Sequence, residues 1–132
     1  MAALSQYAIG VFLALHGLVH AWYVVLSQGW VEVEDAIGWN GQSWLLSGVL
    51  SQGLVLDLAS IAYVLVAVAF VAGGAGYVLD VEWWRTVLVA AAVASTLVLV
   101  AMWDGQLVQL VEKGILGVLI NAVVLVWVLG LE

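Results

Sequence analysis

The residues best suited to chemistry in this sequence are two histidines in its first apolar segment. His16 and His20 lie four positions apart, so on an α-helix their side chains project from one face, about one turn apart. Two imidazoles in this arrangement can share a divalent ion, exchange a proton, or form hydrogen bonds that fix the register of neighbouring helices. The spacing is compatible with all three uses.

Asp57 is the acidic residue that can join these histidines. It stands near the start of the second long apolar segment, which an antiparallel arrangement would bring beside the second half of the first. A set of His16, His20 and Asp57 would suit a borderline divalent metal, with Asn121 as an outer hydrogen-bond partner. A proton relay is the other use, in which a neutral His20 exchanges a proton with Asp57.

Other polar residues are predicted to lie at a similar depth in the membrane as these histidines. Counted at about 1.5 Å per residue, His20, Ser95, Thr96 and Asn121 fall in the same half of a bilayer. An aspartate at the centre of a membrane costs about 2.5–3.5 kcal/mol on insertion scales, so such groups usually face the interior of a bundle. We therefore predict a polar intramembrane layer made of His16, His20, Asp57, Ser95, Thr96 and Asn121.

The elements that position this layer are predicted to lie in lipid. Of the 132 residues, 67% are hydrophobic and only 8% are charged, and the mean hydropathy is +1.22. A water-soluble domain of this length could not bury so much apolar surface. We therefore expect a multi-pass protein of the cell membrane, with the lipid bilayer as its first partner.

Several function classes are excluded by composition. The absence of cysteine removes thiolate metal sites and a cysteine nucleophile. Two basic residues, Arg85 and Lys113, stand against nine acidic ones, so nucleic acid is not an expected partner. Neither a Ser-His-Asp order nor a phosphate-binding glycine loop occurs, which favours a non-enzymatic protein. The acidic, lysine-poor composition is typical of salt-loving archaea.

Apolar segments long enough to cross about 30 Å of hydrocarbon predict four helices, over residues 6–27, 54–79, 83–103 and 114–131. Residues 44–79 would measure about 54 Å as one helix, so we assign residues 44–53 to a short interfacial helix. Short connections favour an all-α, up-down-up-down transmembrane four-helix bundle forming a single domain over residues 1–132. The amino-terminal amine favours cytoplasmic termini.

Small and aromatic residues mark the faces and ends of these helices. Ala69, Ala72, Gly73 and Gly76 form a small-residue face on which a neighbouring helix can pack closely. Tryptophans cluster at the predicted helix ends, where amphipathic rings favour the membrane interface. The expected interfacial anchors are Trp22, Trp30, Trp44, Trp83, Trp84 and Trp103.

Three motifs resemble those of a family of small, uncharacterised four-helix membrane proteins of bacteria and archaea. They are the HGLVH sequence at residues 16–20, the pair Trp83-Trp84, and Trp103-Asp104 followed by Gly117 and Asn121. The architecture is more distantly similar to the DoxX-type group. The acidic segment 28–43 and the long spacing from Trp103 to Gly117 depart from the family pattern. The resemblance implies the four-helix fold and, through the DoxX-like likeness, quinone-linked redox chemistry.

Two functions remain open from the sequence. The first is a non-enzymatic membrane subunit or binding module, whose helix faces engage other chains, a second copy of itself or lipids, and whose polar layer fixes the packing. The alternative is a protein that handles a metal, protons or a quinone through His16, His20, Asp57 and Asn121. A divalent metal or a quinone is the cofactor that this alternative would require.

Overall fold

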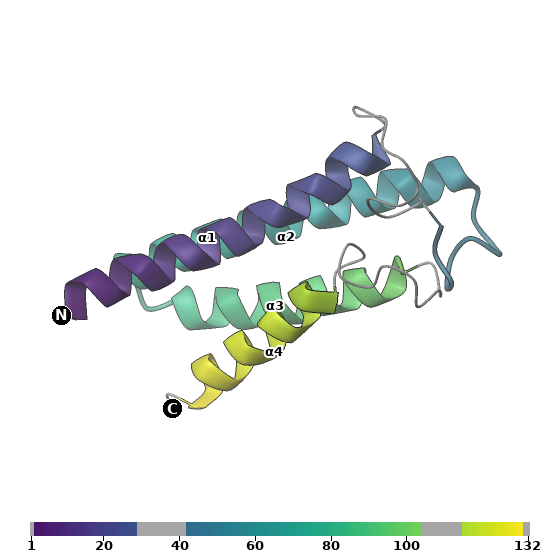
Figure 1. Cartoon of the computed structure of the whole chain (residues 1–132). Helices are drawn as coiled ribbons and strands as arrows, with labels where there is room; N and C mark the ends of the chain where they lie inside the picture. Colours follow the sequence, from purple (N-terminus) through teal and green to yellow (C-terminus); the bar gives the residue numbers. More distant parts are fainter. Residues whose placement is uncertain (1, 29–41, 104–114, 131–132) are drawn as a thin grey trace.

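Four α-helices form the part of the chain that the structure describes. The computed structural model describes residues 2–28, 42–103 and 115–130, and these residues contain helices and turns without strands (Figure 1). The helices are α1 (Ala2–Ser27), α2 (Gln52–Val78), α3 (Trp84–Ala101) and α4 (Ile115–Gly130). The predicted all-α, four-helix fold is confirmed. Helix α1 begins four residues earlier than predicted and ends at the predicted residue, Ser27, and the bounds of the other three helices differ from the prediction by one or two residues.

The outer surface of the helices is apolar. Within the described residues, three stretches are long and apolar enough to cross a membrane: Ala3–Val25, Gln52–Val78 and Trp84–Ala101. Helix α4 is equally apolar but shorter over its described residues. Large side chains such as Val68, Leu97 and Val126 are more than half exposed along these helices. Contiguous apolar surface of this extent indicates a membrane protein surrounded by lipid.

Helices α1 and α2 pack along their length at very short range. A methyl group placed at Gly17 would lie 2.5 Å from the Cβ atom of Phe70, and one at Gly74 would lie 2.9 Å from the carbonyl oxygen of Gly10. Side chains larger than hydrogen therefore have no room at these crossings. In lipid, such close contact between helices supplies the dispersion energy that water-driven burial would supply elsewhere.

Polar contacts at both ends of this pair define its direction. The Gln6 amide donates to the carbonyl oxygens of Tyr77 and Val78, each at 3.1 Å. At the other end, the Gln28 amide donates to the Ser60 hydroxyl at 2.7 Å. The start of α1 therefore lies beside the end of α2, which makes the two helices antiparallel. Figure 1 shows the start of α1 and the end of α4 at the same end of the molecule.

A hydrogen-bonded turn joins α2 to α3. Asp80 has a positive φ of 56°; its amide donates to Tyr77, and the amide of Val81 donates to Gly76. These two bonds form a Schellman motif, which satisfies the last carbonyl groups of a helix through one left-handed residue. The Gly76 position is closed by the Trp83 and Val81 side chains. The turn therefore fixes the angular position from which α3 starts.

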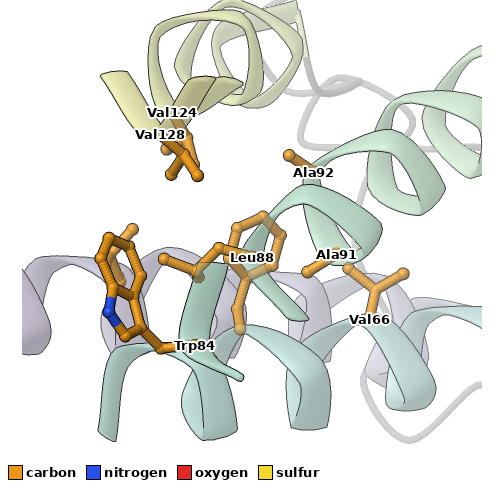
Figure 2. Packing of buried hydrophobic residues seen from close by; sticks show 9 residues of the cluster. Val66, Trp84, Leu88, Ala91, Ala92, Val124 and Val128 are labelled. Atoms are coloured by element: carbon orange, nitrogen blue, oxygen red, sulfur yellow. The ribbon is translucent and has the colours of Figure 1, made fainter. Parts of the chain in front are cut away.

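Two groups of buried side chains hold the four helices together. One lies toward the α2–α3 turn and includes Leu13, Phe70 and Leu88, with Val124 and Val128 from α4; Figure 2 shows the α4 valines above Leu88 and Trp84. The second group lies nearer the other end and includes Tyr23, Val55, Tyr63 and Leu99. The polar layer lies between these two apolar groups.

The predicted interfacial helix at residues 44–53 is wrong. Residues 44–49 form hydrogen-bonded turns, and α2 already begins at Gln52. The Ser51 hydroxyl accepts a hydrogen bond from the Leu54 amide and caps α2. Gly53, a residue type that often marks a bend, lies inside the first turn of the helix. A serine cap explains the boundary better, because it satisfies an amide that the first turn leaves open.

These turns are docked on the end of α3. The Ser43 hydroxyl donates to the carbonyl oxygen of Ala101, and the Trp44 indole donates to that of Val100 at 2.6 Å. The Trp44 amide donates to the carbonyl oxygen of Trp103 at 2.7 Å. Carbonyl groups in the last turn of a helix have no partner within the helix. Segment 42–51 supplies partners for them and so ties α2 to the far end of α3.

Candidate functional site

The predicted polar layer forms around His16. Its Nε2 atom lies 2.8 Å from the side-chain oxygen of Asn121 on α4. Because an amide oxygen can only accept, this ring nitrogen carries the proton and donates. The other ring nitrogen, Nδ1, is then a bare acceptor in the neutral ring. His16 is only 6% exposed, so this acceptor lies within the protein.

His20 has the opposite tautomer. Its Nδ1 atom lies 3.0 Å from the carbonyl oxygen of His16 and 3.1 Å from that of Gly17. Both partners are acceptors, so Nδ1 carries the proton and Nε2 is bare. The Ser95 hydroxyl lies 2.6 Å from Nε2 and donates to it. One turn of α1 therefore presents two neutral imidazoles whose protons sit on different ring nitrogens.

Asn121 and Ser95 connect the two histidines. The Asn121 amide donates to the Ser95 hydroxyl at 2.8 Å and to the Thr96 hydroxyl at 3.1 Å. Thr96 in turn donates to the carbonyl oxygen of Ala92 at 2.9 Å. The hydrogen bonds run in one direction, from His16 through Asn121 and Ser95 to His20. Asn121 and Ser95 are fully buried, and a buried amide or hydroxyl without such partners would be costly.

Aromatic rings of α2 enclose the histidines on one side. The Phe70 ring meets His16 edge-on, with the ring centroids 4.8 Å apart, and stacks on His20 at 5.7 Å. Tyr63 lies against His20 at 6.1 Å. Phe70 and Tyr63 are almost fully buried. Apolar walls of this kind keep water away and strengthen the hydrogen bonds they surround.

Asp57 does not lie in this layer. Five of the six predicted residues come together, but the Asp57 side chain is exposed. The buried residues around it on α2 are Val55 and Ala59. Each is two positions away, which is about 200° around a helix, so Asp57 lies on the opposite side. The described residues contain no group of three His, Cys, Asp or Glu that could hold a metal, and the predicted set of His16, His20 and Asp57 is not formed.

A cavity of about 200 Å³ lies beside the two histidines. Residues from α1, α3 and α4 line it, among them His16, His20, Leu99 and Gly117. It exists because α1 and α4 do not pack extensively on each other, whereas α1–α2, α2–α3 and α3–α4 do. Val19 and Leu116 also line it and are more than half exposed. Within the described residues, the cavity therefore opens sideways between α1 and α4.

The predicted tryptophan anchors occupy different environments. Trp44 and Trp83 are half exposed or more, Trp22 is 36% exposed, and Trp103 is partly exposed. Trp30 lies outside the described residues. Trp84 was expected to face the interface, but it is buried. It packs against the rings of Tyr77 and Trp127, with centroids 5.0 and 5.6 Å away. Trp84 therefore packs between α2 and α4.

Sequence reasoning missed the residues that surround the polar layer. Gly10 and Gly17 lie seven positions apart, a spacing that returns to the same helix face and could have predicted the contact with α2. Gly117 lies one turn before Asn121, which could have predicted an open space beside that side chain. No local signal identifies Phe70 as the ring that encloses the histidines. Its role follows from the crossing of α1 and α2.

Comparison of the chain with protein-family models, curated proteins and solved structures found no match.

Proposed function

We propose that this chain is a small multi-pass membrane protein that acts without catalysis, as a subunit of a membrane assembly or as a binding module. In this proposal, the polar layer fixes the relative positions of the helices. The outer helix faces engage lipid, other membrane chains or a second copy of the chain. The small size of the chain and the single polar layer that its described residues bury both favour this function.

The observation that carries the proposal is the closed chain of hydrogen bonds between neutral side chains. Each donor from His16, Asn121, Ser95 and His20 has an acceptor in the protein. An arrangement of this kind holds α1 against α3 and α4, although α1 and α4 have little packing contact. Polar side chains commonly join helices in this way in lipid, with average pair energies of about 0.6 kcal/mol.

The alternative function is the handling of protons or a quinone by His16, His20 and Asn121. The observation that favours it is the cavity lined by both histidines, which a lipid-soluble molecule could enter from the side. The metal version is weaker, because Asp57 lies away from the histidines. The resemblance to the DoxX-type group also supports the quinone version of this alternative.

Purification in mild detergent separates the two functions. We expect elemental analysis of the wild-type chain to find no stoichiometric metal and absorption spectroscopy to find no chromophore. The chain should purify either with a membrane partner chain or as an oligomer of itself. His16→Phe and an exposed control, Tyr7→Phe, should give the same composition. A metal or quinone bound at one equivalent, and lost only in His16→Phe, would contradict the proposal.

We further propose that the chain lies in the cell membrane with its termini in the cytoplasm, and that its acidic composition is an adaptation to high salt. Reporter fusions at the carboxyl terminus test the orientation, because a reporter that works only in the cytoplasm is active only if the carboxyl terminus lies there. Activity of a periplasm-specific or exterior-specific reporter at the same position would contradict the proposed orientation.

Folding measured across a salt series tests the proposed adaptation to high salt. Equal stability at low and high salt would contradict this adaptation.

A further inference from the structure

We propose that the cavity between α1 and α4 is a binding site for a neutral, ring-sized hydroxyl compound, such as the phenol head of a membrane amphiphile, and that its hydroxyl donates to Nδ1 of His16. This proposal does not depend on whether the chain is a subunit or a redox protein. It concerns which chemical class of molecule the cavity accepts.

The acceptor is defined by the hydrogen bonds of the polar layer. The Nε2 atom of His16 is committed as a donor to Asn121, so the neutral ring leaves Nδ1 as an acceptor. Among the described residues, no side chain or backbone donor reaches this atom. His16 is 94% buried, since only 6% of it is exposed. A buried acceptor without a donor is an energetic cost that a ligand donor would remove.

The direction of Nδ1 follows from the ring edge that faces α4. The His16 atom closest to a methyl group placed at Gly117 is Cε1, at 3.9 Å. Cε1 lies between the two ring nitrogens. With Nε2 directed at Asn121, Nδ1 is on the Gly117 side of the ring, and both His16 and Gly117 line the cavity. In this proposal, the ring edge formed by Cε1 and Nδ1 faces the cavity.

The size and lining of the cavity select the rest of the ligand. An apolar cavity of roughly 150 Å³ holds benzene in another protein, so about 200 Å³ accommodates one substituted ring. Val19, Leu99, Leu116 and Ile120 supply apolar walls. No charged residue lines the cavity, which disfavours carboxylate and phosphate heads. The exposed rim at Val19 and Leu116 lets an attached chain extend into lipid.

The second histidine does not compete for the ligand. The Nε2 atom of His20 already accepts from Ser95, and its Nδ1 donates to the backbone. The cavity therefore offers one acceptor and no donor from the histidines. Tyr23 also lines the cavity. A phenol can donate to Nδ1 of His16, whereas anisole and benzoquinone, which carry only acceptor oxygens, cannot. Selection for a hydroxyl over a carbonyl or ether is the chemical signature of the proposal.

The test uses the full-length chain in detergent micelles, labelled with nitrogen-15 at histidine and titrated with phenol, anisole, benzoquinone and benzene. We expect phenol to shift the His16 Nδ1 signal saturably, with the His20 signals unchanged. Phenol should bind about tenfold more tightly than anisole, because one net hydrogen bond of about 1.4 kcal/mol corresponds to that ratio. Benzoquinone and benzene should bind no better than anisole.

Gly117→Val provides the matched blocking variant. A Cβ atom at Gly117 would lie 3.3 Å from Leu99 and 3.9 Å from His16, so small adjustments admit it. Valine adds two methyl groups beyond Cβ, and because Gly117 lines the cavity, we expect them to take up part of its volume. Gly130→Val makes the same change on the same helix, where nothing lies within 4 Å. We expect Gly117→Val to weaken phenol binding at least about tenfold and Gly130→Val to leave it unchanged.

The unchanged His20 signals in both variants serve as the check on folding. Equal affinity for phenol and anisole would overturn the proposal, as would a shift that rises linearly without saturation, which indicates partition into the micelle. Binding that survives unchanged in folded Gly117→Val would also overturn it. None of these outcomes bears on whether the chain purifies with partner subunits, so the two proposals fail independently.

Discussion

The two sides of α1 are held in opposite ways. On the α2 side, glycines bring the backbones together, and a methyl group at Gly17 would lie within 2.5 Å of Phe70. On the α4 side, packing is sparse, and the link is the hydrogen bond from His16 to Asn121. The comparison teaches that one helix in lipid can use shape on one face and polar chemistry on the other. The cavity beside the two histidines lies on the second face.

The largest effect should come from breaking the close-packed side. Gly17→Val would place its Cβ atom 2.5 Å from the Cβ atom of Phe70 and 3.0 Å from the carbonyl oxygen of Ala67. We therefore expect a loss of about 3 kcal/mol in unfolding free energy, at the upper end of overpacking costs. Unfolding in mixed micelles with increasing denaturing detergent measures it. Gly53→Ala is the control, because nothing lies within 4 Å of that position. If Gly17→Val lowered the unfolding free energy no more than a substitution at an exposed position does, the α1–α2 contact would not be tight.

The polar side should break at a smaller cost. Asn121→Leu removes the acceptor of His16 and the donor to Ser95 and Thr96, so we expect a loss of about 1–2 kcal/mol. His16→Phe combined with Asn121→Leu should recover part of it, because two apolar partners leave neither group unpaired. The same unfolding experiment measures the double-mutant cycle. Strict additivity of the two losses would mean that the pair does not interact.

A change inside the polar chain should be smaller again and visible mainly by spectroscopy. Ser95→Ala removes the donor to His20 Nε2, and we expect a loss of about 1 kcal/mol. Nitrogen-15 spectra of the wild type should show His16 protonated at Nε2 and His20 at Nδ1. In Ser95→Ala, the His20 Nε2 signal should move while His16 keeps its tautomer. Identical tautomers for both histidines in the wild type would contradict the directed hydrogen-bond chain.

The smallest effect should come from Asp80 in the α2–α3 turn, which belongs neither to the glycine contact with α2 nor to the hydrogen-bonded link to α4. Asp80 has a positive φ of 56°, a conformation that glycine adopts without the steric cost of a side chain. Asp80→Gly should therefore raise the unfolding free energy by about 0.5–1 kcal/mol. Asp80→Ala should lower it, because alanine has the steric cost without the tolerance of aspartate for this conformation. If both variants behaved alike, the left-handed turn would not be present in solution.

The polar layer was predictable from sequence to the extent that depth decides it. His16, His20, Ser95, Thr96 and Asn121 share a depth, and depth follows from counting residues along apolar helices. Asp57 failed the same reasoning because burial also depends on the angle around the helix. The buried residues of α2 include Val55, Ala59 and Tyr63, and Asp57 lies on the other face. In a bundle surrounded by lipid, the buried and the outer faces of a helix are both apolar, so the sequence pattern does not reveal which face of α2 is buried.

The lipid environment and the number of helices were determined by sequence alone, because apolar length and composition suffice to set them. Tertiary structure decided which face of each helix is buried, and with it the tautomers of the two histidines. It also decided that Trp84 is buried and that a cavity remains between α1 and α4. These outcomes depend on helix rotation and crossing, which arise from contacts between residues far apart in the chain, such as Gly17 with Phe70 and His16 with Asn121.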